Sequence, residues 1–148
     1  MQERFETFTV LINRISRNIR KIKNREMAEY GLRSAHVSCL YYLYSEGGLT
    51  ATELCERCEE DKATISRALD YLETNGYLSR EAKGAKRYKS PLTLSETGME
   101  AGKKIAEKID GVLEIISVGL TDEERRAFYH SLSIISESLD AVSKKGNQ

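Results

Sequence analysis

The sequence predicts a mainly α-helical fold with one small β-hairpin, and three observations support that prediction. Apolar side chains recur at steps of three and four residues over long segments near both ends of the chain, which is the spacing of one helix face. Two shorter helical segments in the middle are separated by the tight polar turn Glu59-Glu60. Alternating residues around a glycine-containing turn follow these helices, and that pattern is typical of a β-hairpin.

Composition limits the partners that this chain is expected to have. Its 148 residues are the length of one domain. The 23 basic and 23 acidic side chains cancel, so no overall field attracts the chain to a polyanion and any nucleic-acid contact must be local. No run of about 18 apolar residues and no apolar leader is visible, so we expect a soluble cytoplasmic protein with no membrane partner. The three cysteines, an odd number, are expected to be reduced thiols.

The first expected helix carries an apolar stripe along one face. The stripe consists of Phe5, Phe8, Ile12, Ile15, Ile19 and Ile22. Six cations and no acid lie between residues 13 and 25, so this segment is locally basic. A second helix is expected to start at a cap on Ser34 and to continue through Tyr44, where Gly47-Gly48 ends it.

The middle of the chain predicts a helix-turn-helix. Thr50 and Glu53 have the spacing of a capping box for a short helix over residues 51–58. Asp61 is expected to cap the next helix, which Asn75-Gly76 ends. In that second helix one face is apolar and the first two turns are polar, as in a helix that enters the major groove of DNA. The expected DNA contacts in it are Lys62, Thr64, Ser66 and Arg67.

The segment after Gly76 predicts a basic β-hairpin, or wing, that reaches a flanking groove. Five cations and a single acid lie between residues 79 and 90. Pro91 cannot donate a ladder hydrogen bond, so we place it on the outer edge of the returning strand. A hairpin of two strands is marginal alone, and we expect it to pair with a short segment near Leu49.

Two further helices are expected at the end of the chain. Ser95 opens the first, which ends at Gly119, and a capping box at Thr121 and Glu124 opens the second. Apolar residues of the last helix repeat the spacing of the first helix, so we expect the terminal helices to bury each other across two copies of the chain. The expected dimer interface comprises Phe5, Phe8, Ile12, Ile15, Leu132, Ile135 and Leu139.

These signals together resemble the multiple-antibiotic-resistance regulator (MarR) family of bacterial winged-helix transcription factors. Residues 49–54 read Leu-Thr-Ala-Thr-Glu-Leu, similar to the Leu-Thr-x-x-Glu-Leu of the family's third helix. Residues 61–67 read Asp-Lys-Ala-Thr-Ile-Ser-Arg and resemble the start of its recognition helix. Residues 92–98 read Leu-Thr-Leu-Ser-Glu-Thr-Gly, similar to the family's exit from the wing. The resemblance covers essentially the whole chain.

The resemblance implies a winged helix-turn-helix lobe over residues 34–94, with N- and C-terminal dimerisation helices over residues 1–30 and 95–145. It implies a homodimeric repressor or activator on a pseudo-palindromic operator in double-stranded DNA, and a repressor would be relieved by a small aromatic or amphipathic effector. The expected lining of the effector pocket is Ile15, His36, Leu40 and Leu113. Most members carry Asp-x-Arg at the wing, where this chain has Lys-Arg-Tyr at residues 86–88. We therefore predict that Lys86 and Arg87 contact the groove.

Two alternatives remain open from the sequence. A winged helix can bind another protein instead of DNA. Cys55 and Cys58 have CxxC spacing, which suits a thiol or metal switch, but no second such pair or nearby histidine completes a zinc site, so helix packing is favoured. Cys39 is expected to be a small buried hydrophobe. No catalytic constellation or cofactor motif is visible, and we expect neither enzymatic activity nor a cofactor.

Overall fold

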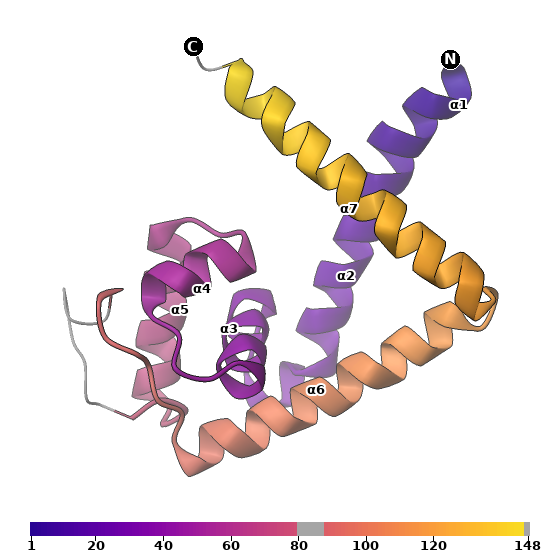
Figure 1. Ribbon diagram of the computed structural model, residues 1–148. Coiled ribbons are helices and arrows are strands. Elements are labelled where there is room, and N and C mark those ends of the chain that lie inside the picture. The colour runs from indigo at the N-terminus through magenta and orange to yellow at the C-terminus, as the bar shows by residue number, and fades with distance from the viewer. Residues whose placement is uncertain (80–87, 147–148) are drawn as a thin grey trace. The chain divides into compact units, whose positions relative to one another are not determined.

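The structure is a computed structural model that describes residues 1–79 and 88–146, and this part of the chain is almost entirely helical (Figure 1). It forms two compact units, Met1–Lys108 and Ile109–Gln148. The helical segments are α1 (Gln2–Phe5), η1 (Glu6–Leu11), α2 (Ile12–Glu26), η2 (Ala28–Tyr30), α3 (Ser34–Ser45), α4 (Ala51–Cys58), α5 (Lys62–Thr74), α6 (Glu96–Ser117) and α7 (Asp122–Lys145). No helix among the described residues is long and apolar enough to cross a membrane.

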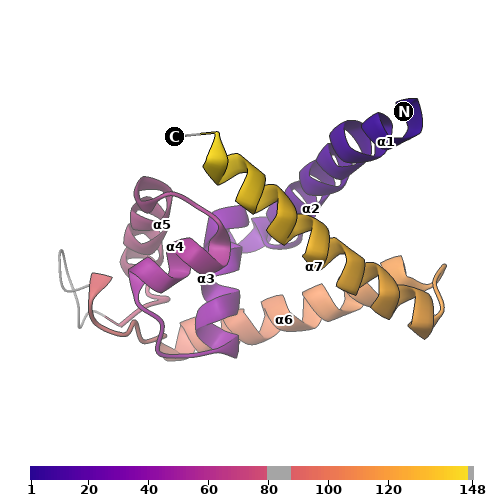
Figure 2. The same cartoon turned by 45° about the horizontal axis from the view of Figure 1, so that its top comes forward.

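The core of the first unit lies where α3, α4 and α5 pack together, as both views of the ribbon show (Figures 1 and 2). Leucines and an isoleucine at the predicted inward positions have no exposed surface, and α2 packs against α3 beside them. These side chains are Leu40, Leu54, Ile65, Leu69 and Leu72. Fully burying one such side chain stabilises the fold by about 1.5 to 3 kcal/mol, so this cluster fixes how the three helices sit.

Three predicted helix starts are confirmed by their caps. The Thr50 hydroxyl accepts from the Glu53 N–H at 3.3 Å, and the Glu53 carboxylate accepts from the Thr50 N–H at 2.7 Å. Thr121 makes the same reciprocal pair with Glu124. The Asp61 carboxylate accepts from the Thr64 N–H at 2.7 Å. Each bond satisfies a helix N–H that has no partner within its own helix.

The predicted cap at Ser34 is wrong by one residue. Arg33 occupies the N-cap position and Ser34 is already helical. The helix still begins there because the side chain of His36, in its own first turn, and that of Asn24 accept the orphan N–H groups. His36 Nδ1 accepts from the Arg33 N–H at 3.0 Å, and the Asn24 side chain accepts from the Ser34 N–H at 2.6 Å. Asn24 lies on α2, so it ties the first long helix to the start of α3.

The first helix is continuous but less regular than its stripe predicts. Residues 6–11 form a π-helical stretch, η1, between α1 and α2. The Thr7 and Thr9 hydroxyls donate to the carbonyls of Glu3 and Phe5, at 2.9 and 2.6 Å. Hydroxyls that donate to carbonyls four residues back compete with the backbone hydrogen bonds of the helix. A π-helical stretch has wider turns than an α-helix and interrupts it locally.

The predicted β-hairpin wing is not confirmed. Its tip, with Lys86 and Arg87, lies outside the described residues. At its base, Leu78 and Leu94 form one antiparallel bridge, and the Ser79 N–H donates to the Thr93 carbonyl at 2.9 Å. The expected pairing near Leu49 is confirmed as a single bond, in which the Leu92 N–H donates to the Leu49 carbonyl at 2.8 Å. The described flanks of the hairpin therefore pair, without forming an extended strand.

The predicted terminal stripes are largely exposed in the single chain. No residue of α1, η1, α2 or α7 is buried. Large apolar side chains exposed on the first helix and on α7 include Phe5, Phe8, Ile15, Ile19, Phe128, Leu132, Leu139 and Val142. A large exposed apolar surface of this kind more often belongs to an interaction site than to ordinary protein surface.

Candidate nucleic-acid interface

The turn between α4 and α5 sets the direction of the helix expected to read DNA. Glu59 adopts a left-handed backbone conformation with φ of 54°, and the Glu60 N–H donates back to the Cys55 carbonyl at 3.2 Å. These features close α4 within two residues, after which Asp61 caps α5. The carboxyl pKa of Asp61 is lowered by its bond from the Thr64 N–H and by the nearby Arg67 charge, so the cap is ionised at neutral pH.

Helix α5 has one buried apolar face and one polar face, as the sequence predicts. Ile65, Ala68, Leu69 and Leu72 are buried against α3 and α4. The four predicted DNA contacts lie away from that core. Lys62 and Arg67 are exposed, and Thr64 and Ser66 are half-buried. These four belong to the first two turns of α5, so the helix presents cations and hydroxyls together at its N-terminal end. Such groups are donors to phosphates and base edges.

Arg67 is positioned by a neighbour on its own helix. One terminal nitrogen of its guanidinium donates to the Thr64 hydroxyl at 3.3 Å. Thr64 itself holds the cap through its backbone N–H. The bond leaves most of the guanidinium fork available, because an arginine side chain has five N–H donors. Thr64 therefore aims Arg67 without consuming its capacity for a bidentate contact.

The returning segment of the wing is attached to the helix-turn-helix through Tyr88. The Lys62 ammonium lies 4.4 Å from the centre of the Tyr88 ring, within the range of a cation–π contact. The Tyr88 carbonyl accepts a bond from the Thr52 hydroxyl at 3.3 Å. Tyr88 thus joins the first residue of α5 to the start of α4. No sequence signal pointed to this contact, because it depends on how the wing returns.

A compact joint links the end of α5 to the start of α6. The Ser95 hydroxyl donates to the Gly76 carbonyl and accepts from the Gly98 N–H, and the Ser95 N–H donates to the Tyr77 carbonyl. Ser95 is therefore the predicted helix cap and also a tie to α5. These bonds use backbone groups of both segments, so they hold the start of α6 against the end of α5.

Three of the four residues predicted to line an effector pocket, Ile15, His36 and Leu40, lie in the first unit, and Leu113 lies in the second. Leu40 has no exposed surface, whereas Ile15 on α2 and Leu113 in the second unit are exposed. His36 stacks on Tyr71 with ring centres 4.2 Å apart. Burial and the neighbouring Arg33 charge lower the pKa of His36, which keeps the ring neutral and able to accept its helix-capping bond. The predicted pocket therefore stays a prediction.

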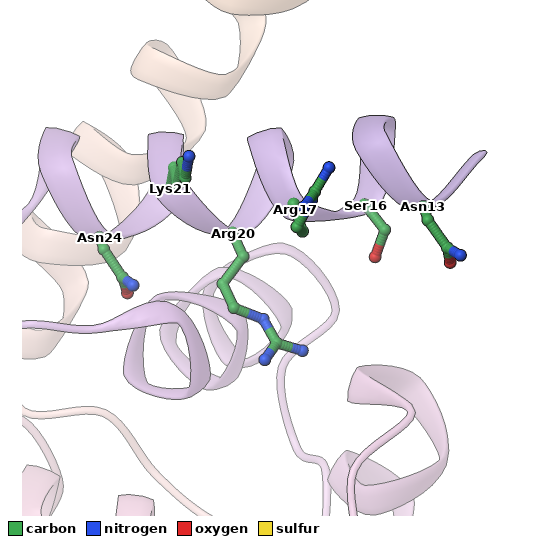
Figure 3. Close-up of a pocket in the computed structure, with 6 residues that line it drawn as sticks. All are labelled: Asn13, Ser16, Arg17, Arg20, Lys21 and Asn24. Atoms are coloured by element: carbon green, nitrogen blue, oxygen red, sulfur yellow. The ribbon is translucent and has the colours of Figure 1, made fainter. Parts of the chain in front are cut away.

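A different hollow lies along α2 (Figure 3). It has a volume of about 350 Å³, and three cations and three uncharged polar side chains line it. The lining residues are Asn13, Ser16, Arg17, Arg20, Lys21 and Asn24. Their spacing places them on one helical face, and Figure 3 shows Arg20 extended away from the helix. The basic cluster noted in the sequence therefore lines a polar hollow.

The described cysteines do not form a metal site. No group of three or more metal-binding side chains occurs within residues 1–79 and 88–146. Cys39 is fully buried, as predicted, whereas Cys55 and Cys58 are half-buried. The CxxC spacing therefore has no third or fourth ligand among the residues that the structure describes.

Comparison with known proteins gives consistent results. Residues 30–87 match the sequence model of the MarR family. The HTH-type transcriptional regulator YwoH of Bacillus subtilis is 29% identical over 119 residues, which cover 80% of this chain and 86% of that protein. A MarR family regulator from Neisseria meningitidis has a similar fold, with a TM-score of 0.80 and 20% identity, covering 97% of this chain and 98% of that chain. The MepR–DNA complex of Staphylococcus aureus is also similar, with a TM-score of 0.78 and 19% identity, covering 89% of this chain and 97% of that chain.

Proposed function

The chain belongs to the MarR family of DNA-binding transcriptional regulators, and we propose that it is a homodimeric repressor of a pseudo-palindromic operator. The observation that carries this proposal is the geometry of α5. Its apolar face is buried, and its capped N-terminal turns present Lys62, Thr64, Ser66 and Arg67 away from the core. In the proposed complex each subunit places these turns in a major groove, with Arg67 contacting a base edge or phosphate and Lys62 a phosphate.

Two copies are needed to read a palindrome, and the exposed stripes supply the surface for a dimer. The apolar residues of the first helix and of α7 have the spacing of helix-packing faces. A two-fold axis through them repeats the recognition helix on the second half-site. Half-sites are then expected about 34 Å apart, or a multiple of that distance.

The proposed contribution of the wing is tested by salt dependence. Replacing Lys86 and Arg87 together with alanine is expected to weaken binding to every duplex and to reduce the slope of log affinity against log salt concentration. Removing one phosphate contact reduces the magnitude of that slope by roughly 0.9, and the two substitutions remove up to four such contacts from a dimer. Fluorescence anisotropy between about 50 and 300 mM salt, roughly the range over which such contacts weaken, measures the slope. An unchanged slope would remove the wing from the interface.

Relief by an effector is the second part of the proposal, and the hollow on α2 suggests its chemistry. Arg17, Arg20 and Lys21 line that hollow, so an effector with a carboxylate is favoured. Benzoate is expected to bind at least about tenfold more tightly than benzamide, which has the same shape and no charge, because charge-assisted bonds are roughly twice as strong as neutral ones. Calorimetric titration of the parent and of Arg20→Ala measures both affinities. Equal affinity for the two compounds would exclude an anionic effector here.

A further inference from the structure

The returning segment of the wing touches the recognition helix through one aromatic ring. Tyr88 is half-buried, and the Lys62 ammonium lies 4.4 Å from the centre of its ring. Lys62 is exposed and is the first helical residue of α5. The sequence assigns the contacts of this segment to Lys86 and Arg87, whereas the structure brings Tyr88 to the helix that presents the other proposed DNA contacts.

A separate hydrogen bond places the backbone of Tyr88. The Thr52 hydroxyl donates to the Tyr88 carbonyl at 3.3 Å. Thr52 lies in the first turn of α4, and α4 packs against α5. Because the acceptor is a backbone group, this bond does not depend on the tyrosine side chain. A substitution at residue 88 can therefore remove the ring and keep the bond that holds the returning segment.

The position of Lys62 explains why an aromatic partner suits it. The N-terminal end of a helix carries partial positive charge, which disfavours a cation there. The neighbouring Asp61 carboxylate accepts the Thr64 N–H at 2.7 Å, and no carboxylate within residues 1–79 and 88–146 forms an ion pair with Lys62. An aromatic ring attracts an ammonium without neutralising it. Lys62 is thus held while its full charge stays available to an anion.

We propose that Tyr88 is a positioning residue that holds the Lys62 ammonium ready for a DNA phosphate. This inference rests on the proposed function, in which Lys62 contacts a phosphate. A lysine side chain loses much rotamer freedom when it is fixed, and that loss opposes binding. Because the ring already orders the side chain in the free protein, less of the loss falls on DNA binding. The wing then contributes to affinity through α5 as well as through its tip.

Nuclear magnetic resonance of the free protein tests the contact without DNA. Protons above the face of an aromatic ring resonate upfield, so the ε-methylene protons of Lys62 are expected upfield of those of Lys103. Lys103 is an exposed lysine that pairs with Glu107 on α6. Tyr88→Phe should keep the upfield shift, and Tyr88→Leu should abolish it. A parent protein in which the two lysines resonate together would overturn the proposal.

Affinity for DNA tests the consequence. A cation–π contact raises the population of the held geometry by roughly two- to fivefold, so over two copies Tyr88→Leu is expected to weaken binding by about five- to thirtyfold. Tyr88→Phe should bind as tightly as the parent. Phosphate contacts carry no sequence information, so the selected operator and a scrambled duplex should lose the same factor. A loss confined to the operator, or a loss in Tyr88→Phe, would mean that Tyr88 contacts DNA itself and would overturn the proposal.

A double-mutant cycle separates positioning from a merely structural role. In a Lys62→Gln background the ammonium is absent, so Tyr88→Leu should weaken binding no further. Lys103→Gln is the matched control background, and there Tyr88→Leu should cause its full loss. Circular dichroism verifies that each variant folds. An equal loss in the Lys62→Gln background and in the parent would show that the ring acts elsewhere. If the parent binds no duplex specifically, the proposed function and the role of Lys62 fail together, whereas a missing upfield shift overturns only the role of Tyr88.

Discussion

Replacing Arg67 with alanine is expected to abolish sequence-specific binding to the operator while the dimer persists in gel filtration. A bidentate interaction of arginine with a base contributes about 1 to 3 kcal/mol of discrimination. The substitution removes two such interactions from a dimer, which corresponds to about 2 to 6 kcal/mol, or at least about thirtyfold in affinity. The expected effect is large because Arg67 lies outside the core and Thr64 aims it from the same helix face.

Arg125→Ala is the matched control for this experiment. Arg125 lies on α7, where it pairs with Asp122 at 2.9 Å, so its replacement removes a cation without touching the lobe. Anisotropy titration of both variants against the selected operator and a scrambled duplex measures how much tighter each variant binds the operator. If Arg67→Ala binds the operator as tightly as the parent, α5 is not the element that reads the DNA.

Gly98→Ala is expected to have the largest effect on stability, because a methyl group there meets the carbonyl of Tyr77 well inside contact distance. That carbonyl also accepts the Ser95 N–H, so it cannot move without breaking the joint between α5 and α6. Gly102→Ala meets the Tyr44 side chain in the same way. Overpacking of this kind destabilises a fold by about 1 to 3 kcal/mol and occasionally more. We expect the destabilisation by Gly98→Ala to lie at or above the upper end of that range.

Gly111→Ala provides the comparison on the same helix. A methyl group at Gly111 meets no atom within 4 Å, and replacing a helical glycine with alanine stabilises by about 0.5 to 1 kcal/mol. The two substitutions are thus expected to shift the urea midpoint in opposite directions. Equal midpoints for the Gly98 and Gly111 variants would show that the joint is looser than its contacts indicate.

Much of the helical structure follows from local sequence signals. Thr50, Asp61 and Thr121 each cap a helix where short polar side chains precede an apolar period, and such bonds form between residues three apart. The buried face of α5 follows from the spacing of Ile65, Leu69 and Leu72, because burial of an apolar face dominates helix orientation. Local chemistry and tertiary packing agree at these positions.

The features that sequence patterns did not predict depend on contacts between distant segments. Asn24, which lies on α2, accepts a hydrogen bond from the Ser34 N–H at the start of α3, so a cap at Ser34 is not required. Tyr88 reaches Lys62 and Thr52 only after the chain has returned from the wing. A local apolar period describes the face of one helix and does not encode contacts between distant segments.

Selection of duplexes from a random pool by the full-length reduced protein tests the central claim most directly. If two copies of α5 read DNA across a two-fold axis, the enriched sequences should contain one inverted repeat whose half-sites are about one helical turn apart, or a multiple of it. Two chains should bind each duplex, and affinity should fall steeply with salt. A pool that yields no common sequence, or a motif without two-fold symmetry, would contradict the account.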